Sequence, residues 1–170
     1  TLMPLNFAHS TKLGIFNSKL IKKAEVADKT MAFYFEKPLD FKFKAGQTMD
    51  VTVENPAETD AEGNSRTFCI ASAPYENMLM IATRMRDTAF KRVLKNAPLN
   101  LAVQIEGPFG SMILHNDASK PAVFLAGGIG ITPFFAMIKE ATVEKKAHKI
   151  FLFYSNRTLK DAAFLSELQE

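Results

Sequence analysis

The chain has 170 residues, of which 47% are hydrophobic, and its 21 Lys and Arg against 18 Asp and Glu leave a formal net charge of +3. This length suits one globular domain, or one domain and part of another. This small net charge gives no argument for binding nucleic acid or a membrane. A site for an anionic ligand must therefore be a local cluster of basic residues.

The sequence has one cysteine, Cys69, which excludes an intramolecular disulfide. No apolar run approaches the roughly 20 residues of a membrane-spanning helix. No secretory signal is recognisable, and a cytoplasmic location is therefore expected.

The first 115 residues contain a series of short strand patterns. Residues 1–18 have no steady hydrophobic period and are left unassigned. Runs of β-branched, aromatic and large apolar residues, separated by turn residues, then predict strands at 19–26, 30–36, 47–55, 66–72, 77–84, 101–107 and 111–115. Such spacing indicates a small barrel or sandwich. Within 87–97, apolar residues at i, i+3, i+4 and i+7 predict one short helix.

The pattern changes near residues 116–121. Apolar strands are predicted at 122–126 and 149–155, and helices at 132–146 and from 161 to the end. Strands that alternate with helices indicate a parallel sheet covered on both faces. A doubly wound domain uses about five or six such strands. We therefore expect this part to continue beyond Glu170, since the apolar residues Phe164, Leu165 and Leu168 still need a partner.

The clearest local motif is "AGGIGITPF". Gly127, Gly128 and Gly130 follow an apolar strand, and Thr132 and Pro133 are suited to the N-cap and the first turn of a helix. Glycines let the backbone approach a phosphate, which the free N–H groups of a helix start can bind. A phosphate site is favoured over a simple tight turn.

Basic residues form a second cluster: Arg84, Arg86, Lys91, Arg92 and Lys95, with Asp87 the single acid among them. These residues either converge on a diphosphate or form a solvated face. His9, His115 and His148 are far apart in the sequence and give little support for a metal site. "GPFG" at 107–110 is interpreted as a turn.

Three motifs in this order, "RTFCIAS", "EGPFG" and "AGGIGITP", resemble the ferredoxin-NADP reductase-like flavoproteins. The resemblance implies an all-β flavin-binding barrel of Greek-key type at 19–117. It implies that the beginning of an α/β doubly wound nucleotide domain follows at 118–170, after an uncertain segment at 1–18.

The resemblance also implies roles for the first motif. Arg66 would pair with the flavin diphosphate, Phe68 would lie against the isoalloxazine, and Cys69 would take the catalytic position near flavin N5, where the family has a hydroxyl. A thiol is a weaker hydrogen-bond donor than a hydroxyl. The alternative is that Phe68 is a core ring and Arg66 an exposed strand residue.

A glycine-x-x-serine segment of the family aligns with Thr88 to Lys91, although both marker residues differ here. The cofactor-binding residues expected in total are Arg66, Thr67, Phe68, Cys69, Ala82, Thr83, Thr88, Phe90, Lys91, Gly127, Gly128, Gly130, Ile131, Thr132, Pro133, Ser155, Asn156 and Arg157. No metal site is expected.

The predicted strand "KIFLFYS" ends at Ser155, Asn156 and Arg157 without a carboxylate. An arginine at this place accommodates the 2′-phosphate of NADP, whereas an acid favours NAD. NADPH is therefore preferred to NADH, although Arg157 could instead be solvated or pair with Asp161.

The implied activity is hydride transfer from NAD(P)H to N5 of FAD, followed by electron transfer to a ferredoxin-like protein or a small molecule. FAD is chosen over FMN by resemblance, and no nucleic-acid or membrane partner is expected. The alternative is a flavin-binding or electron-relay module, or an inactive fragment, without its own reductase activity.

Overall fold

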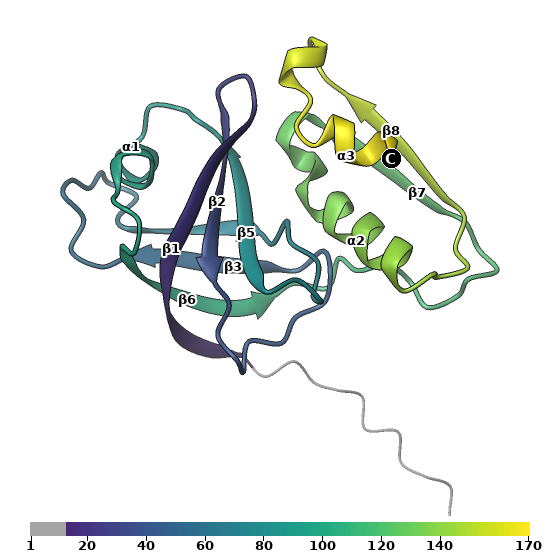
Figure 1. The fold of residues 1–170 in the computed structure, drawn as a ribbon, viewed down its shortest axis with the longest axis horizontal. Helices are drawn as coiled ribbons and strands as arrows, with labels where there is room; N and C mark the ends of the chain where they lie inside the picture. The colour runs from purple at the N-terminus through teal and green to yellow at the C-terminus, as the bar shows by residue number, and fades with distance from the viewer. Residues whose placement is uncertain (1–12) are drawn as a thin grey trace, which may run out of the picture.

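A computed structural model describes residues 13–170, and its first part is a six-stranded antiparallel sheet (Figure 1). The strands are β1 (Gly14–Ala27), β2 (Thr30–Glu36), β3 (Thr48–Val53), β4 (Ser65–Cys69), β5 (Met78–Arg84) and β6 (Ala102–Phe109). They lie in the order β4-β3-β6-β1-β2-β5. Just beyond β4, the Ala71 N–H donates to the Met80 carbonyl of β5 at 2.7 Å, which brings the two edges of the sheet together as a barrel.

The barrel has an apolar core of large side chains, in which Phe33, Phe35 and Leu20 are fully buried. Helix α1 (Ala89–Asn96) buries Phe90 and Leu94 in the same cluster. The apolar spacing of the sequence predicted this helix, and its burial explains why one helix interrupts the strands. The predicted barrel with one short helix is confirmed.

The second part contains two parallel strands, β7 (Ala122–Gly127) and β8 (Ile150–Ser155), as the alternating pattern predicted. The 3₁₀ turn η1 (Gly128–Ile131) and helix α2 (Thr132–Val143) connect them. After β8 come the turn η2 (Leu159–Asp161) and the short helix α3 (Leu165–Gln169). This is the beginning of a doubly wound α/β arrangement.

The two parts pack directly on each other through an apolar cluster. Ala32 and Met80 of the barrel contact a group that includes Ile131, Phe135 and Phe164 of the α/β part. The rings of Phe135 and Phe164 are stacked, with centroids 4.3 Å apart. This shared core fixes the ends of β5 and β7 beside each other.

Two predicted elements are wrong. Residues 111–115 do not form a strand, although "SMILH" is apolar, because only Leu114 is buried and no strand among residues 13–170 pairs with the segment. The "GPFG" segment is not simply a turn, since Gly107 pairs with Gly14 of β1, and Phe109 pairs with Thr48 of β3. Strand β1 begins at Gly14, within the segment left unassigned, and residues 1–12 lie outside the described part.

The predicted C-terminal helix is interrupted. Phe164 has a left-handed backbone, with φ +60°, and separates η2 from α3. Its side chain is 3% exposed, so the prediction that Phe164 lacks a partner is wrong. Leu168 also packs against this cluster, partly buried.

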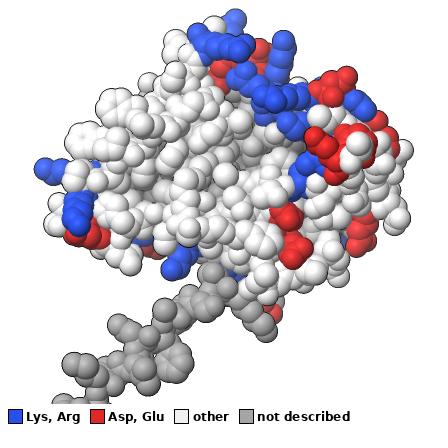
Figure 2. All heavy atoms as spheres, turned by 180° about the vertical axis from the view of Figure 1, so that it is seen from behind, with Lys and Arg blue, Asp and Glu red and all other residues white. Residues whose placement is uncertain are grey.

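Exposed apolar surface lies instead on the parallel sheet. Val123, Leu125, Phe151 and Phe153 alternate with buried residues, and Leu125 is 72% exposed. Figure 2 shows a broad uncharged area on one side and charged side chains gathered on the other. Among residues 13–170, no helix is long and apolar enough to cross a membrane.

Candidate functional site at the junction of the two parts

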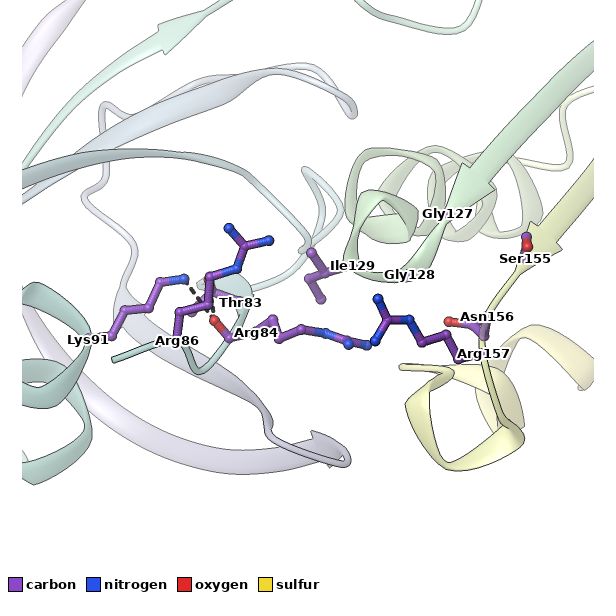
Figure 3. Close-up of a pocket in the computed structure, with 10 residues that line it drawn as sticks. All are labelled: Thr83, Arg84, Arg86, Lys91, Gly127, Gly128, Ile129, Ser155, Asn156 and Arg157. Atoms are coloured by element: carbon purple, nitrogen blue, oxygen red, sulfur yellow. Dashed lines mark hydrogen bonds between the residues drawn. The ribbon is translucent and has the colours of Figure 1, made fainter. Parts of the chain in front are cut away.

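A pocket of about 480 Å³ lies where the barrel meets the α/β part (Figure 3). It is lined by Thr83, Arg84, Arg86, Lys91, Gly127, Gly128, Ile129, Ser155, Asn156 and Arg157. The first four come from β5, the loop after it and α1. The others come from the end of β7, from η1, and from the end of β8 and the residues that follow it. The pocket therefore exists only because the two parts pack together.

The lining contains four cationic side chains and no carboxylate. Burial lowers the pKa of Lys91, and the neighbouring charges of Arg86 and Arg66 lower it further. Lys91 Nζ donates to the Arg84 carbonyl at 2.7 Å. Among the described residues, Arg86 and Arg157 form no ion pair, so cationic groups remain available to an anion.

The glycine turn forms one wall of this pocket. Gly128 has φ +52°, a left-handed conformation that favours glycine, and a Cβ at Gly127, Gly128 or Gly130 would meet no atom within 4 Å. These glycines are therefore not required by packing on the described residues. They leave the backbone open to a ligand, as the phosphate hypothesis needs.

The expected capping role of Thr132 is wrong. Ile131 is the N-cap residue, and Thr132 is the first residue of α2, followed by Pro133. The Thr132 hydroxyl donates to the Ile129 carbonyl at 3.2 Å. The reason is that the 3₁₀ turn η1 leads directly into α2, so the Ile129 carbonyl, three residues earlier, lies within reach of the hydroxyl.

The end of β8 contributes Ser155, Asn156 and Arg157 to the same pocket, as Figure 3 shows. Asn156 Oδ1 is buried and accepts no hydrogen bond from the described residues. Asp161 pairs with Arg84 at 3.3 Å rather than with Arg157. The alternative that Arg157 is held by Asp161 is therefore not supported.

Arg66 lies outside this pocket lining, close to α1. Its Nη1 donates to the carbonyls of Glu62, Gly63 and Ser65, at 2.7 to 3.0 Å. Its Nη2 lies 2.9 Å from Asp60 Oδ1 and 2.9 Å from Glu62 Oε2. The loop before β4 thus holds the Arg66 guanidinium in place. Arg66 is therefore not the exposed strand residue of the alternative interpretation.

Two aromatic rings and Arg66 form a stack. The Arg66 guanidinium lies over the Phe90 ring at 5.3 Å, and the rings of Phe90 and Phe68 have centroids 5.9 Å apart. Phe90 is 3% exposed and belongs to the core, whereas Phe68 is partly buried at its edge. Phe90 thus supports the other two groups from behind, and Phe68 retains some accessible surface.

Thr67 and Cys69 have different surroundings. Strand alternation puts Thr67 on the face opposite Arg66 and Phe68, and its hydroxyl donates to Asp50 on β3. Burial raises the pKa of the Cys69 thiol, and a hydrogen bond with Thr132 offsets part of that rise. Cys69 therefore lies where β4 meets the start of α2.

The remaining expected residues are mostly interior. Ala82, Thr83, Ile131 and Thr132 are buried. Thr88 is the N-cap residue of α1 but makes no side-chain capping bond. The structure brings Thr83, Lys91, Gly127, Gly128, Ser155, Asn156 and Arg157 into one pocket; it places Arg66, Phe68 and Phe90 in the neighbouring stack.

Sequence reasoning did not assign cofactor contacts to Arg84, Arg86 or Ile129. The first two were visible as part of a basic cluster, but nothing in the sequence showed which cations face the glycine turn. His115 and His148, far apart in the sequence, have ring centroids 4.9 Å apart. Among residues 13–170, however, no group of three potential metal ligands occurs.

Comparison with known proteins agrees with this geometry. Residues 124–170 match the family model of the oxidoreductase NAD-binding domain. Methane monooxygenase component C of Methylosinus trichosporium is 26% identical over 133 residues, covering 77% of this chain and 37% of the relative. A flavohemoprotein of Bacillus subtilis is 23% identical over 156 residues, covering 89% of this chain and 38% of the relative.

Solved structures show the same architecture over nearly the whole chain. Phthalate dioxygenase reductase is 25% identical, with a TM-score of 0.76 over 92% of this chain and 48% of that one. Ferredoxin-NADP+ reductase from Plasmodium falciparum is 19% identical, with a TM-score of 0.78 over 91% of this chain and 64% of that one.

The chain therefore has the barrel and incipient nucleotide domain of the ferredoxin-NADP reductase-like flavoproteins, as its three motifs predicted. The chain spans less than two fifths of the length of the two curated relatives named above.

Proposed function

We propose that this chain is the flavin-binding and nicotinamide-binding part of an NAD(P)H-dependent flavoprotein reductase. The observation that carries the proposal is the junction pocket, whose lining combines four cationic side chains with an open glycine turn. A site for an uncharged small molecule would not need cationic side chains from both the barrel and the α/β part. Their presence in one pocket favours a ligand with several phosphates.

The side chains present fit a dinucleotide. The lining supplies guanidinium and ammonium donors for phosphate oxygens, and arginine's planar fork is suited to them. The buried, unpaired Asn156 Oδ1 is an acceptor that a ribose hydroxyl can satisfy. Phosphate donors and a hydroxyl acceptor thus occur together in one pocket.

The Arg66 stack and the family resemblance support a flavin position beside Phe68. Arg66 and the N-terminus of α1 would bind the diphosphate of FAD, and Phe68 would lie against the flat ring. Cys69 would lie near the reacting edge, where its half-buried thiol limits access of water. The protein thus supplies orientation and charge compensation.

The bound coenzymes supply the redox chemistry, because the nicotinamide carries a hydride that flavin N5 can accept. Arg66, Lys91 and the junction arginines would hold the phosphates, so that the two rings meet at the junction. We assign no side chain as an acid or base, because a hydride transfer requires neither.

We propose NADPH as the preferred coenzyme. Arg157 follows β8 beside the pocket. Its charge helps to lower the pKa of Asp161, but it forms no ion pair among residues 13–170, so its guanidinium is available to a 2′-phosphate. No carboxylate lines this end of the pocket to bind an unphosphorylated ribose. NADH is expected to bind less tightly.

The electron acceptor is proposed from the relatives. Phthalate dioxygenase reductase is described as transferring electrons from pyridine nucleotides to [2Fe-2S]. By analogy, we propose an iron-sulfur protein or a small molecule as acceptor for this chain. A flavin-binding relay without reductase activity is the alternative that the next experiment distinguishes.

The proposed function is tested by mixing FAD-loaded protein with NADPH under anaerobic conditions and following the visible absorbance of the flavin. We expect the absorbance to bleach, and to bleach more slowly with NADH. Binding of FAD without bleaching by either coenzyme would favour the relay module, and no binding of FAD would contradict both.

A further inference from the structure

The loop between β3 and β4, residues 54–64, is fastened to the region where the proposed function places the flavin diphosphate. We call it the acidic loop, because it carries Glu54, Glu58, Asp60 and Glu62. Glu58 pairs with Arg92 of α1 at 2.6 and 2.9 Å. Asp60 and Glu62 both pair with Arg66.

Asp60 makes the most informative contacts. Its Oδ1 accepts from Arg66 Nη2 at 2.9 Å, and its Oδ2 accepts from the Ala89 N–H at 3.1 Å. Ala89 is the first residue of α1, so Asp60 joins a guanidinium to the start of a helix. These are the two kinds of donor that bind phosphate in proteins.

The Asp60 carboxylate is also stabilised as an anion. Burial alone would raise its pKa, but hydrogen bonds from the N–H groups of Glu62 and Ala89 and from Arg66 outweigh this effect and hold the pKa below its usual value. Asp60 is therefore charged at neutral pH, like the phosphate whose donors it occupies.

Arg66 has little capacity left for another anion. Its Nη1 is directed to three carbonyl oxygens and its Nη2 to two carboxylates, which leaves only Nε–H without a partner among residues 13–170. A diphosphate placed beside Asp60 and Glu62 would also meet two like charges. Binding of the flavin through Arg66 thus requires these carboxylates to move away.

We propose that Asp60 is an internal competitor of the flavin diphosphate, which must displace it from Arg66 and from the start of α1. This inference rests on the proposed function. When FAD binds, phosphate contacts replace the contacts of the Asp60 carboxylate. The apparent affinity for FAD is therefore the intrinsic affinity multiplied by the fraction of molecules in which Asp60 has released Arg66 and the start of α1. Asp60 thereby tunes flavin affinity and keeps the site ordered before flavin arrives.

Flavin binding by Asp60→Asn and by the wild-type chain tests the proposal. FAD and riboflavin are titrated separately, with fluorescence as the readout. Riboflavin has no phosphate and serves as the matched ligand. Asp40→Asn serves as the matched charge control, because Asp40 is exposed and forms no ion pair within residues 13–170. Circular dichroism and urea unfolding establish that each variant is folded.

We expect Asp60→Asn to bind FAD about fivefold more tightly or better, since one charge-assisted contact no longer has to be given up. Riboflavin binding and the Asp40→Asn variant should not change. Glu62→Gln removes the second carboxylate without touching α1, and should give a smaller gain in FAD affinity. It keeps the proposal testable if Asp60→Asn does not fold.

FAD binding that is unchanged or weaker in both folded variants would overturn the proposal while leaving the proposed function intact, because Asp60 would then not compete with the diphosphate. Weaker binding would indicate that Asp60 positions Arg66. An equal gain for riboflavin would also overturn it, since riboflavin carries no diphosphate. Failure of every variant, including the wild-type chain, to bind FAD would overturn the proposed function and this inference together.

Discussion

Arg84 at the end of β5 and Asp161 in η2 form an ion pair of 3.3 Å between residues 77 positions apart in the sequence. The pair joins the barrel to the α/β part at the edge of the junction pocket. Asp161 also accepts hydrogen bonds from the N–H and the hydroxyl of Thr158, at 3.1 and 2.8 Å. The Asp161 carboxylate therefore fixes the positions of both the turn after β8 and the Arg84 guanidinium.

The first prediction concerns pH. The Thr158 hydroxyl, with the Thr158 N–H and the Arg84 charge, holds the pKa of Asp161 below its ordinary value despite the opposing effect of burial. A carboxyl with a lowered folded-state pKa stabilises the fold above its unfolded pKa, and this contribution is lost as the pH falls through the folded value. Asp161→Asn should therefore be less stable than the wild-type chain at pH about 6, and the difference should shrink below pH about 4.

Urea unfolding at several pH values measures this difference, with Asp40→Asn as the control. A difference that stays constant down to pH about 2.5 would show that the charge of Asp161 does not contribute.

The second prediction concerns packing between the two parts. Gly46 has φ +100°, and a Cβ there would lie 2.1 Å from the Met112 carbonyl oxygen and 2.2 Å from Met137 Cε of α2. Gly46→Ala should lower the free energy of unfolding by at least about 2 kcal/mol, through strain and overpacking. Gly63→Ala is the matched control, with φ +76° and open space around the added Cβ, and should cost about 1 to 2 kcal/mol. Equal losses would contradict the close approach at Gly46.

The third prediction concerns Arg157 and the 2′-phosphate. Calorimetric titration with 2′,5′-ADP and with 5′-AMP compares the two ribose forms without any redox step. Arg157→Ala should weaken 2′,5′-ADP binding by about tenfold or more, the size of a lost charge-assisted contact, and leave 5′-AMP almost unchanged. Arg157→Lys, which keeps the charge, should lose less. The same loss for both ligands would mean that Arg157 does not recognise the 2′-position.

The fourth prediction concerns Cys69, whose thiol has its pKa raised by burial. Since the thiolate is the reactive form, iodoacetamide at pH about 8 should alkylate the folded chain much more slowly than the chain unfolded in urea. The single cysteine makes the rate specific to this position. FAD should slow the reaction further, because the proposed flavin site lies beside Cys69. A rate that FAD leaves unchanged would argue against that placement.

Much of the fold could be predicted because hydrophobic spacing reports burial. The alternating residues of β3 and the helical spacing of α1 correspond to buried faces, and the apolar run of β2 is buried over most of its length. The strand predicted at residues 111–115 was wrong because an apolar run does not reveal whether another strand is available to pair with it. The break at Phe164 was also hidden, since neither its left-handed backbone nor its stack on Phe135 leaves a mark in the hydrophobic spacing.

The candidate site could be predicted only in part. Motif order identified the glycine turn and the segment from Arg66 to Cys69, because these residues are contiguous. The pairing of Arg84 with Asp161, and of Arg66 with Asp60, depends on how loops fold back on strands. Sequence spacing contains no information on such side-chain pairs, so it could not show which cations are free.

Flavin binding through Arg66 underlies both the proposed function and the inference about Asp60. An equilibrium titration of the purified chain with FAD, repeated with Arg66→Ala and with riboflavin as ligand, is the decisive measurement. We expect one FAD per chain and, for the folded Arg66→Ala variant, an affinity lower by about tenfold to a hundredfold, with riboflavin unaffected. No saturable FAD binding by the wild-type chain, or an unchanged FAD affinity in Arg66→Ala, would contradict the account.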